Sequence, residues 1–174
     1  VIIGRSLGYV LLYNFDYYSN HLIEILFLWQ GGMSFHGGLI GVIIAQIATC
    51  KKFKVKFLIL TDISSLTVPL GFMLGRIANF INGELYGRIT QHPIGIIFPN
   101  GGNLPRHPSQ LYEAFFEGFI LFLILNLLFY FSKIKSLTGM LTGVFILLYG
   151  VFRFLIEFFR EPDTQLGLFF LSLT

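Results

Sequence analysis

The sequence predicts an all-α, polytopic transmembrane helix bundle with a small loop domain at its outer face. Hydrophobic residues make up 55% of the 174 residues and charged residues only 12%, about half the charged share of a typical water-soluble domain. The mean hydropathy is +0.75. All lysines fall into two clusters between apolar runs, as expected for the inside loops of a membrane protein. The net charge of +3 is small, and its pattern excludes a nucleic-acid surface.

Four apolar stretches are candidates for spans, each close to the roughly 20 residues that cross a bilayer core. They run over 33–50, 57–81, 111–131 and 137–159. Two shorter apolar runs, 1–13 and 166–174, are expected to be partial spans. We therefore expect one transmembrane domain over residues 1–174, with about four full spans and two partial ones. Glycine pairs at small-xxx-small spacing, such as Gly71 with Gly75 and Gly139 with Gly143, predict close helix packing.

The stretch 82–108 separates two of these spans and is rich in proline, glycine and asparagine. Such a composition predicts an extramembrane loop or cap rather than a helix. If both lysine clusters, 51–56 and 133–135, lie in the cytoplasm, this loop lies outside. The single cysteine, Cys50, then lies at a cytoplasmic helix end and excludes an internal disulfide.

This orientation brings polar side chains from four spans to the outer face. They are Ser34, His36, Arg76, Asn79, Asn82, Glu84, Arg88, His107, Gln110, Glu113, Arg153, Glu157 and Arg160. Ionisable groups at membrane depth are costly and tend to face a bundle interior or a wet cavity. Their concentration at one leaflet predicts an interfacial site that is open to lipid headgroups.

Two arginines carry the strongest chemical signal. Arg76 shares a helix face with Asn79 and Asn82, because the three are spaced by three residues. Arg153 stands four residues from both Tyr149 and Glu157. A guanidinium is permanently charged and can grip a phosphate through two parallel hydrogen bonds. Arginines on two spans therefore predict a phosphodiester site.

Structural roles stand beside these interpretations. Arg153 and Glu157 can neutralise one another across a helical turn, and Asn79 and Asn82 can cap or join helices. His36, which lies among glycines, can be a hydrogen-bonded structural residue or a base.

Glu113 and Glu117 fall early in the helix after Pro108, where the helix dipole favours negative charge. The spacing of histidine, glutamate and cysteine residues predicts no metal site, and no cofactor is expected.

Four blocks of the sequence resemble the prolipoprotein diacylglyceryl transferase family. They are FHGGLIG from Phe35, GRIANFINGELYGR from Gly75, RHPSQLYEA from Arg106 and RFLIEFFREPD from Arg153. The blocks occur in the family's order and extend over most of the chain. The resemblance implies a multi-pass protein of about seven spans in the bacterial inner membrane, with its active site toward the outer leaflet.

The resemblance also implies the reaction and its residues. The diacylglyceryl group of phosphatidylglycerol would pass to the lipobox cysteine thiol of a prolipoprotein signal peptide, forming a thioether and releasing glycerol 1-phosphate. The residues expected to be catalytic are His36, Arg76, Tyr149 and Arg153. Those expected to bind phosphatidylglycerol are Arg76, Asn79, Glu84, Gly87 and Glu157, to which we add Arg160 because it lies close to the stripe of Arg153.

In this hypothesis the two arginines stabilise the departing phosphate dianion. His36 is the best candidate to deprotonate the thiol, whose ordinary pKa is about 8.5. Glu84 and Glu157 are expected to orient arginines.

Two other functions remain open from the residues. One is a transporter or channel for an anionic solute, for which the mid-membrane polar residues are Asp62, Ser64, Ser65 and Thr67. The other is an accessory membrane subunit.

Overall fold

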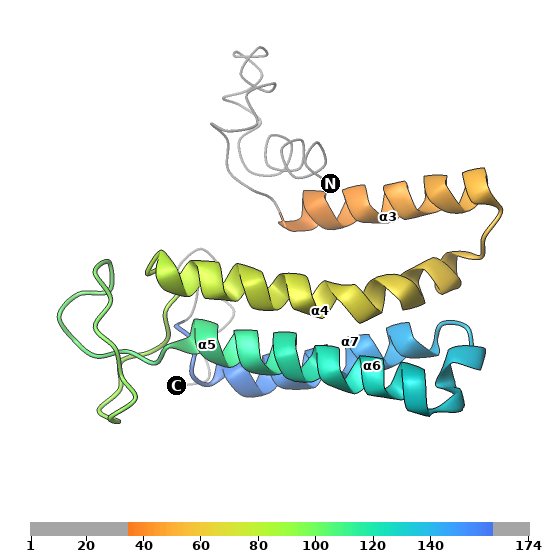
Figure 1. Ribbon diagram of the computed structural model, residues 1–174. Helices are drawn as coiled ribbons and strands as arrows, with labels where there is room; N and C mark the ends of the chain where they lie inside the picture. Colours follow the sequence, from red (N-terminus) through yellow and green to blue (C-terminus); the bar gives the residue numbers. More distant parts are fainter. Residues whose placement is uncertain (1–34, 162–174) are drawn as a thin grey trace, which may run out of the picture. The chain divides into compact units, whose positions relative to one another are not determined.

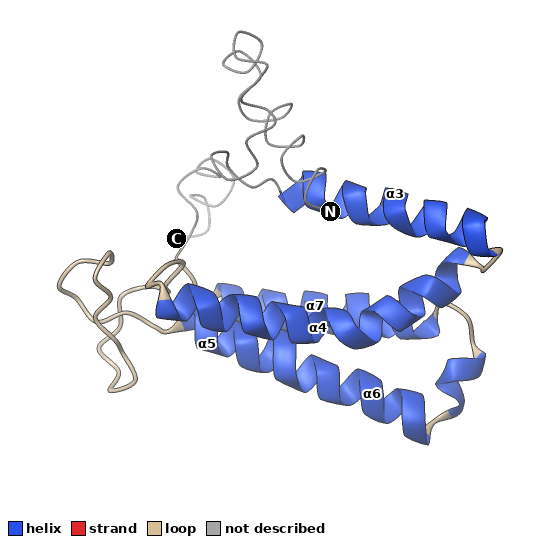
Figure 2. Ribbon diagram, turned by 45° about the horizontal axis from the view of Figure 1, so that its top comes forward, coloured by secondary structure: helices blue, strands red, loops and turns tan. Residues whose placement is uncertain are grey.

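A computed structural model describes residues 35–161, apart from the side chains of Phe35, His36 and Lys135. This part of the chain is helical, with loops between the helices and isolated β-bridges in place of strands (Figure 2). It belongs to two compact units, Val1–Leu60 and Thr61–Thr174, each of which we describe by itself.

The first unit contains α3, Phe35–Phe53, followed by a short turn into the start of α4. Lys51 and Lys52 lie in the last turn of α3, where the negative end of the helix dipole favours cations. The helix forms where the sequence predicts it. However, it is not among the described helices that are long and apolar enough to cross a membrane. A span at 33–50 therefore stays a prediction. The expected partial spans 1–13 and 166–174 lie outside the described residues.

Three helical segments of the described chain are long and apolar enough to cross a membrane. They are Phe57–Ile81, Ser109–Phe131 and Met140–Glu157. Each agrees within a few residues with a predicted span. The first is α4, the second combines α5 (Ser109–Glu113), the π-helix η2 (Ala114–Ile120) and α6 (Leu121–Phe131), and the third is α7. The fold prediction of a transmembrane helix bundle is confirmed.

These helices form the core of the second unit. Leu121, Leu125 and Leu141 are buried together, and α6 packs against α7. Many large apolar side chains on the outside are exposed, such as Ile146 at 62% and Phe154 at 67%. Outward-facing apolar side chains are what a hydrocarbon solvent permits, so the surface agrees with a membrane location.

Close packing between α4 and the second segment depends on Gly118. A Cβ atom added at Gly118 would stand 2.5 Å from Cβ and 2.8 Å from Cα of Met73. By contrast, no described atom lies within 4 Å of such a position at Gly71 or Gly75. Gly139 has φ 86° and is the N-cap of α7 rather than part of a helix pair. Among the described residues of the second unit, close helix approach is therefore made at Gly118 and not at the predicted pairs.

The end of α4 is fixed by a backbone motif that requires glycine. The amide of Gly83 donates to the carbonyl of Phe80 at 3.1 Å, and the amide of Glu84 donates to that of Asn79 at 2.9 Å. Gly83 has φ 67°, the left-handed conformation that glycine adopts without strain at this position. The helix therefore ends at Ile81, and Asn82 directly follows it, with its amide donating to the carbonyl of Ala78 at 2.9 Å.

The predicted loop after α4 is a cap without helices. His107 donates its amide to the carbonyl of Arg88 at 2.9 Å, and Arg88 donates its own to that of Phe159 at 3.0 Å. Isolated bridges join Gly87 to Arg160 and Ile89 and Ile96 to Arg106. Phe159 and Arg160, which follow α7, are thus hydrogen-bonded to the loop. Figure 1 shows the loop at the end of the second unit where α4 finishes and α5 begins.

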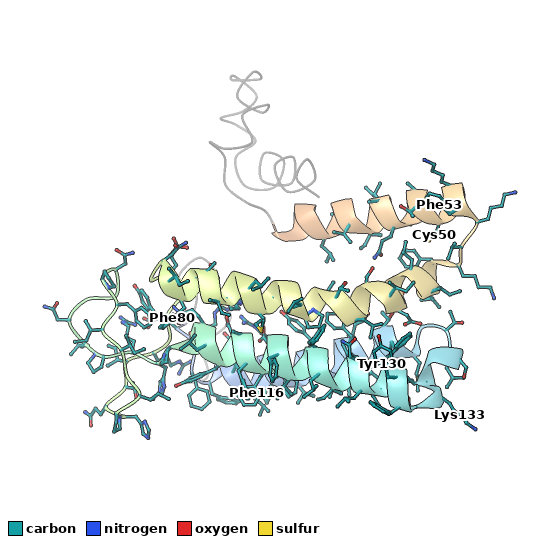
Figure 3. The ribbon with its side chains drawn as sticks, in the orientation of Figure 1. Cys50, Phe53, Phe80, Phe116, Tyr130 and Lys133 are labelled. Carbon is teal, nitrogen blue, oxygen red and sulfur yellow. The ribbon has the colours of Figure 1, made fainter. Side chains whose placement is uncertain are left out.

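The opposite end carries the lysine-bearing turn. Figure 3 labels Lys133 and Tyr130 there and Phe80 near the loop. Asp62, early in α4, accepts the amide of Gly139 at 2.6 Å and that of Thr142 at 2.8 Å. The two Asp62 oxygens thus cap the start of α7, whose N-cap residue has no side chain of its own.

Candidate functional site

The polar site of the second unit lies at its loop end and is built around Glu113. This residue closes α5 and is only 1% exposed. Its Oε2 lies 2.8 Å from Nε of Arg76 in α4, and its Oε1 lies 2.7 Å from Nη1 of Arg153 in α7. One buried carboxylate therefore joins guanidinium groups from two other helices. The Arg153 contact has hydrogen-bond geometry, whereas the Arg76 contact is an ion pair that leaves Oε2 without a hydrogen bond.

The first turn of α5 holds Glu113 in this position. Gln110 donates from Nε2 to the carbonyl of Glu84 at 2.6 Å, and Ser109 donates from Oγ to that of Leu85 at 3.2 Å. Both donors are fully buried. The start of α5 is therefore tied to the backbone that directly follows α4, which fixes Glu113 relative to the end of the helix that carries Arg76.

Further charges surround Arg153. Its Nη2 lies 3.3 Å from Oε2 of Glu157, and its Nη1 lies 3.8 Å from Oε1 of Glu117. Arg160 contributes Nη1 at 3.7 Å from Glu157 and Nε at 3.9 Å from Glu113. The predicted pair of Arg153 and Glu157 is thus present, and it is part of a larger network.

The network is layered by charge. The carboxylates of Glu113 and Glu117 are 1% exposed, whereas Arg76 and Arg153 are 23% and 27% exposed. Buried anions stand behind guanidinium groups that are accessible from outside. Such a layer is suited to an anion that approaches from outside, because a planar guanidinium can turn one edge to the buried carboxylate and another to a phosphate.

Tyr149 lies one turn before Arg153 on α7, and its ring contacts aromatic neighbours. The ring centroids of Tyr149 and Phe72 are 5.4 Å apart, and Phe145 stacks on Tyr149 at 6.0 Å. Asn79 is half-buried one turn after Arg76. Both residues are therefore on the helices that bear the arginines.

Gly87 and Glu84 lie in the loop after α4 and form no ion pair with the described arginines. A Cβ atom at Gly87 would collide with the carbonyl oxygen of Phe159 and stand 2.8 Å from that of His107. Gly87 thus permits close approach of three backbone segments, and through its bridge to Arg160 it sets the position of that residue. The carboxylate of Glu84 is exposed and forms no ion pair with a described residue. The expectation that Glu84 orients an arginine stays a prediction.

Arg106, together with the predicted residues His107 and Arg88, stabilises the cap. Arg106 pairs with Glu161, donates from Nε to the carbonyl of Gly101 at 2.9 Å and covers the ring of Tyr86. His107 Nδ1 lies 3.2 Å from the hydroxyl of Tyr112. Arg88 donates from Nε to the carbonyl of Arg160 at 2.9 Å, which further fixes the segment after α7.

His36 has a described backbone in the first turn of α3, but its side chain and the whole of Ser34 lie outside the described residues. The prediction of His36 as base therefore stays a prediction. No group of three potential metal ligands occurs in residues 35–161.

The sequence interpretation missed the central role of Glu113 and the burial of Glu117. In the sequence, the favourable position of both carboxylates near a helix start already explained their presence, so no contact with the arginines was predicted. Charge balance could have indicated their role. Three arginines at one end of a bundle need more negative charge nearby than the single carboxylate of Glu157 supplies. A second signal was the polar run from Ser109 to Glu113 at the start of a span, where uncompensated polar groups are costly.

Comparisons with known proteins identify the family. A family model described as prolipoprotein diacylglyceryl transferase matches residues 1–174. A protein of Ehrlichia canis is 58% identical over 168 residues, covering 96% of this chain and 64% of the relative. Proteins of Rickettsia felis and Geobacter sulfurreducens are 56% and 55% identical, and the chain covers 67% and 64% of their lengths.

Each of these relatives is named phosphatidylglycerol–prolipoprotein diacylglyceryl transferase. The chain spans about two thirds of the length of the curated relatives that it matches. Residues 35–161 contain three helices that are long and apolar enough to cross a membrane, and this membrane protein belongs to the prolipoprotein diacylglyceryl transferase family.

Proposed function

We propose that this chain provides the phosphate-binding part of an enzyme that transfers the diacylglyceryl group of phosphatidylglycerol to the lipobox cysteine of a prolipoprotein. The reaction forms a thioether and releases glycerol 1-phosphate. The names of the relatives supply the reaction class. The observation that carries the proposal is the pair of arginines, Arg76 and Arg153, from two helices, gathered on the buried Glu113.

In the proposed reaction a cysteine thiolate attacks the carbon through which the diacylglyceryl group is bonded to the phosphate oxygen. A sulfur–carbon bond forms, and the carbon–oxygen bond to phosphate breaks, so the electron pair leaves with the phosphate oxygen. The phosphate thereby gains a negative charge. Guanidinium groups of Arg76 and Arg153 stabilise this charge more strongly in the transition state than in the lipid, which is the requirement for catalysis.

The other residues have supporting parts in the proposal. Tyr149 and Asn79 lie one turn from the arginines and complete the wall that the headgroup contacts. Arg160 and Glu157 extend the charged network toward the cap. His36 is the proposed acceptor of the thiol proton, because a neutral imidazole is available near neutral pH. Gly87 acts through the position of Arg160, and Glu84 contributes its carbonyl to the anchor of α5.

The proposed location is the bacterial inner membrane, with the site toward the outer leaflet. The arginine end of the second unit is opposite the turn that carries Lys133 (Figure 3), and lysines favour the cytoplasmic side. Cys50 tests this orientation. A membrane-impermeant maleimide should miss Cys50 in intact cells and label it in opened vesicles. Labelling from outside intact cells would reverse the orientation.

The activity is tested with the full-length protein, phosphatidylglycerol labelled in its acyl chains and a lipobox peptide. Transfer of label to the peptide, and its absence when the peptide cysteine is replaced by serine, is the expected result. Release of labelled fatty acid without peptide modification would contradict the proposal.

A transporter or channel for anions is not favoured. Asp62, one of the polar residues expected at mid-membrane from the sequence, lies early in α4 and caps the start of α7. Ser65 and Thr67 donate to carbonyls within their own helix, those of Thr61 and Ser64.

A further inference from the structure

We infer that Glu113 is a positioning residue that sets the distance and facing of the two phosphate-binding arginines. The inference rests on the proposed function, because it assigns a part to Glu113 within the same site. Glu113 itself need not contact the lipid. It acts by holding Arg76 and Arg153 so that their outer edges converge on one phosphate.

The contacts of Glu113 connect three helical segments at one point. Each carboxylate oxygen takes a different arginine, Oε2 with Arg76 at 2.8 Å and Oε1 with Arg153 at 2.7 Å. The third cation, Arg160, stands at 3.9 Å. Guanidinium groups repel one another, so a shared carboxylate is needed to keep them close at a site partly withdrawn from water. Removal of its charge leaves these cations free to separate.

The geometry of Arg76 leaves its binding edge available. Its closest contact with Glu113 is through Nε, and neither Nη atom donates a hydrogen bond to a residue in 35–161. Arg153 uses Nη1 for Glu113, and its Nη2 reaches the half-exposed Glu157 at 3.3 Å. Both guanidinium groups are thus held from the buried side, and a phosphate approaching from outside meets their remaining donors.

The position of Glu113 is itself fixed by more than one hydrogen bond in the preceding turn. Ser109 and Gln110, in the turn that precedes it, donate to the carbonyls of Leu85 and Glu84. These carbonyls directly follow the end of α4, so the helix that carries Arg76 and the helix that carries Glu113 are fixed to one another. A rigidly held carboxylate is what a preorganised anion site requires, since donors that must reorganise during the reaction contribute less.

Loss of the Glu113 charge should affect lipid binding and turnover differently. Glu113→Gln removes a negative charge beside the arginines. The electrostatic attraction between the arginines and the anionic lipid is therefore kept or strengthened. The ordered spacing of the arginines is lost, and with it the stabilisation of the charge that develops on the departing phosphate. We therefore expect kcat to fall more than tenfold, while KM for phosphatidylglycerol stays the same or decreases.

Two further variants sharpen the test. Glu113→Asp keeps the charge but is shorter by one methylene, so it cannot reach both arginines and should also lose more than tenfold in kcat. Asp62→Asn is the matched control: it makes the same change from carboxylate to amide, but Asp62 caps the start of α7 at the end of the second unit opposite the arginines. We expect its loss to be under threefold.

The experiment measures kcat and KM for label transfer by the full-length protein in detergent, together with the thermal midpoint of each variant. No transfer by the wild-type protein would refute the proposed function itself. Given wild-type transfer, an unchanged kcat with a lower KM in Glu113→Gln would reduce Glu113 to a competing counter-ion and overturn the inference. Equal losses in Glu113→Gln and Asp62→Asn, or a loss that follows the thermal midpoint, would also overturn it.

Discussion

Replacement of Gly87 by alanine should loosen the cap and displace Arg160. The added methyl group would meet the carbonyl oxygen of Phe159, and it would stand 2.8 Å from the carbonyl oxygen and 2.9 Å from Cβ of His107. Two of these are backbone atoms that cannot turn away. The strand-like contacts around Gly87 are short, with its amide 2.8 Å from the same His107 carbonyl. The three segments must therefore separate.

The expected magnitude follows from overpacking. Inserting a methyl group into a tightly packed site costs about 1 to 3 kcal/mol, which corresponds to a change of about 5- to 150-fold in an equilibrium constant. Amide hydrogen exchange reports this equilibrium directly. The amides of Gly87 and His107 donate within the cap, and that of Arg88 donates to Phe159 after α7. All three should exchange faster by that factor in Gly87→Ala.

Turnover should also fall in Gly87→Ala, because the loosened cap no longer holds Arg160 in place. Arg160 is held to Gly87 by a bridge and to Arg88 through its carbonyl, and its guanidinium is 3.7 Å from Glu157. Gly71→Ala is the control, because no described atom lies within 4 Å of its added methyl group. Unchanged exchange rates in the cap of Gly87→Ala would refute the reasoning, as would an equal change in Gly71→Ala.

Two further predictions concern the site itself. Arg76→Lys and Arg153→Lys keep the charge but lose the planar fork, so each should lower the rate of label transfer by more than tenfold, about 1.4 kcal/mol of barrier or more; near-normal rates at equal amounts of folded protein would leave only a generic charge role. Transfer should survive treatment with EDTA, since phosphate charge is met by arginine; a loss that one divalent ion specifically restores would reveal a metal requirement.

The fold was predictable because each span has its own local signal. Apolar runs end at lysines or at proline-rich segments, and both signals act within a few residues of the helix end. The Phe57–Ile81 helix has the bounds that the sequence predicts. Its final turn was not predicted in detail, although Gly83 at the left-handed position after Ile81 is a common way for a helix to end.

The site was predictable only in part, because spacing along one helix reveals pairs within that helix. Arg153 and Glu157 are four residues apart, so their contact follows from the helical repeat. The contacts of Glu113 join residues 37 to 47 positions away in the chain, and no periodicity encodes them. The π-helix that follows Glu113 is likewise invisible in the apolar pattern, although it carries Glu117 and the close contact at Gly118.

Asp62 shows how a carboxylate within a membrane-spanning helix can have a purely structural role, and that role can be tested. It accepts the amides of Gly139 and Thr142 and the hydroxyl of Thr142 at 2.7 Å. Loss of a capping side chain costs about 0.5 to 2 kcal/mol, and hydrogen bonds to a charged group are the stronger ones. We expect Asp62→Ala to lose about 2 kcal/mol of unfolding free energy in detergent.

The transfer rate per folded Asp62→Ala molecule should remain near that of the wild type, since Asp62 lies at the end of the second unit opposite the arginines. Thr67→Ala is the control, because the Thr67 hydroxyl donates only to the carbonyl of Ser64 in its own helix, and its stability should change by less than about 0.5 kcal/mol. Normal stability of Asp62→Ala combined with lost transfer would contradict the capping role and place Asp62 in the functional machinery. A stability loss with intact turnover is the result that the geometry requires, because two backbone amides at the start of α7 have no other acceptor among their described neighbours.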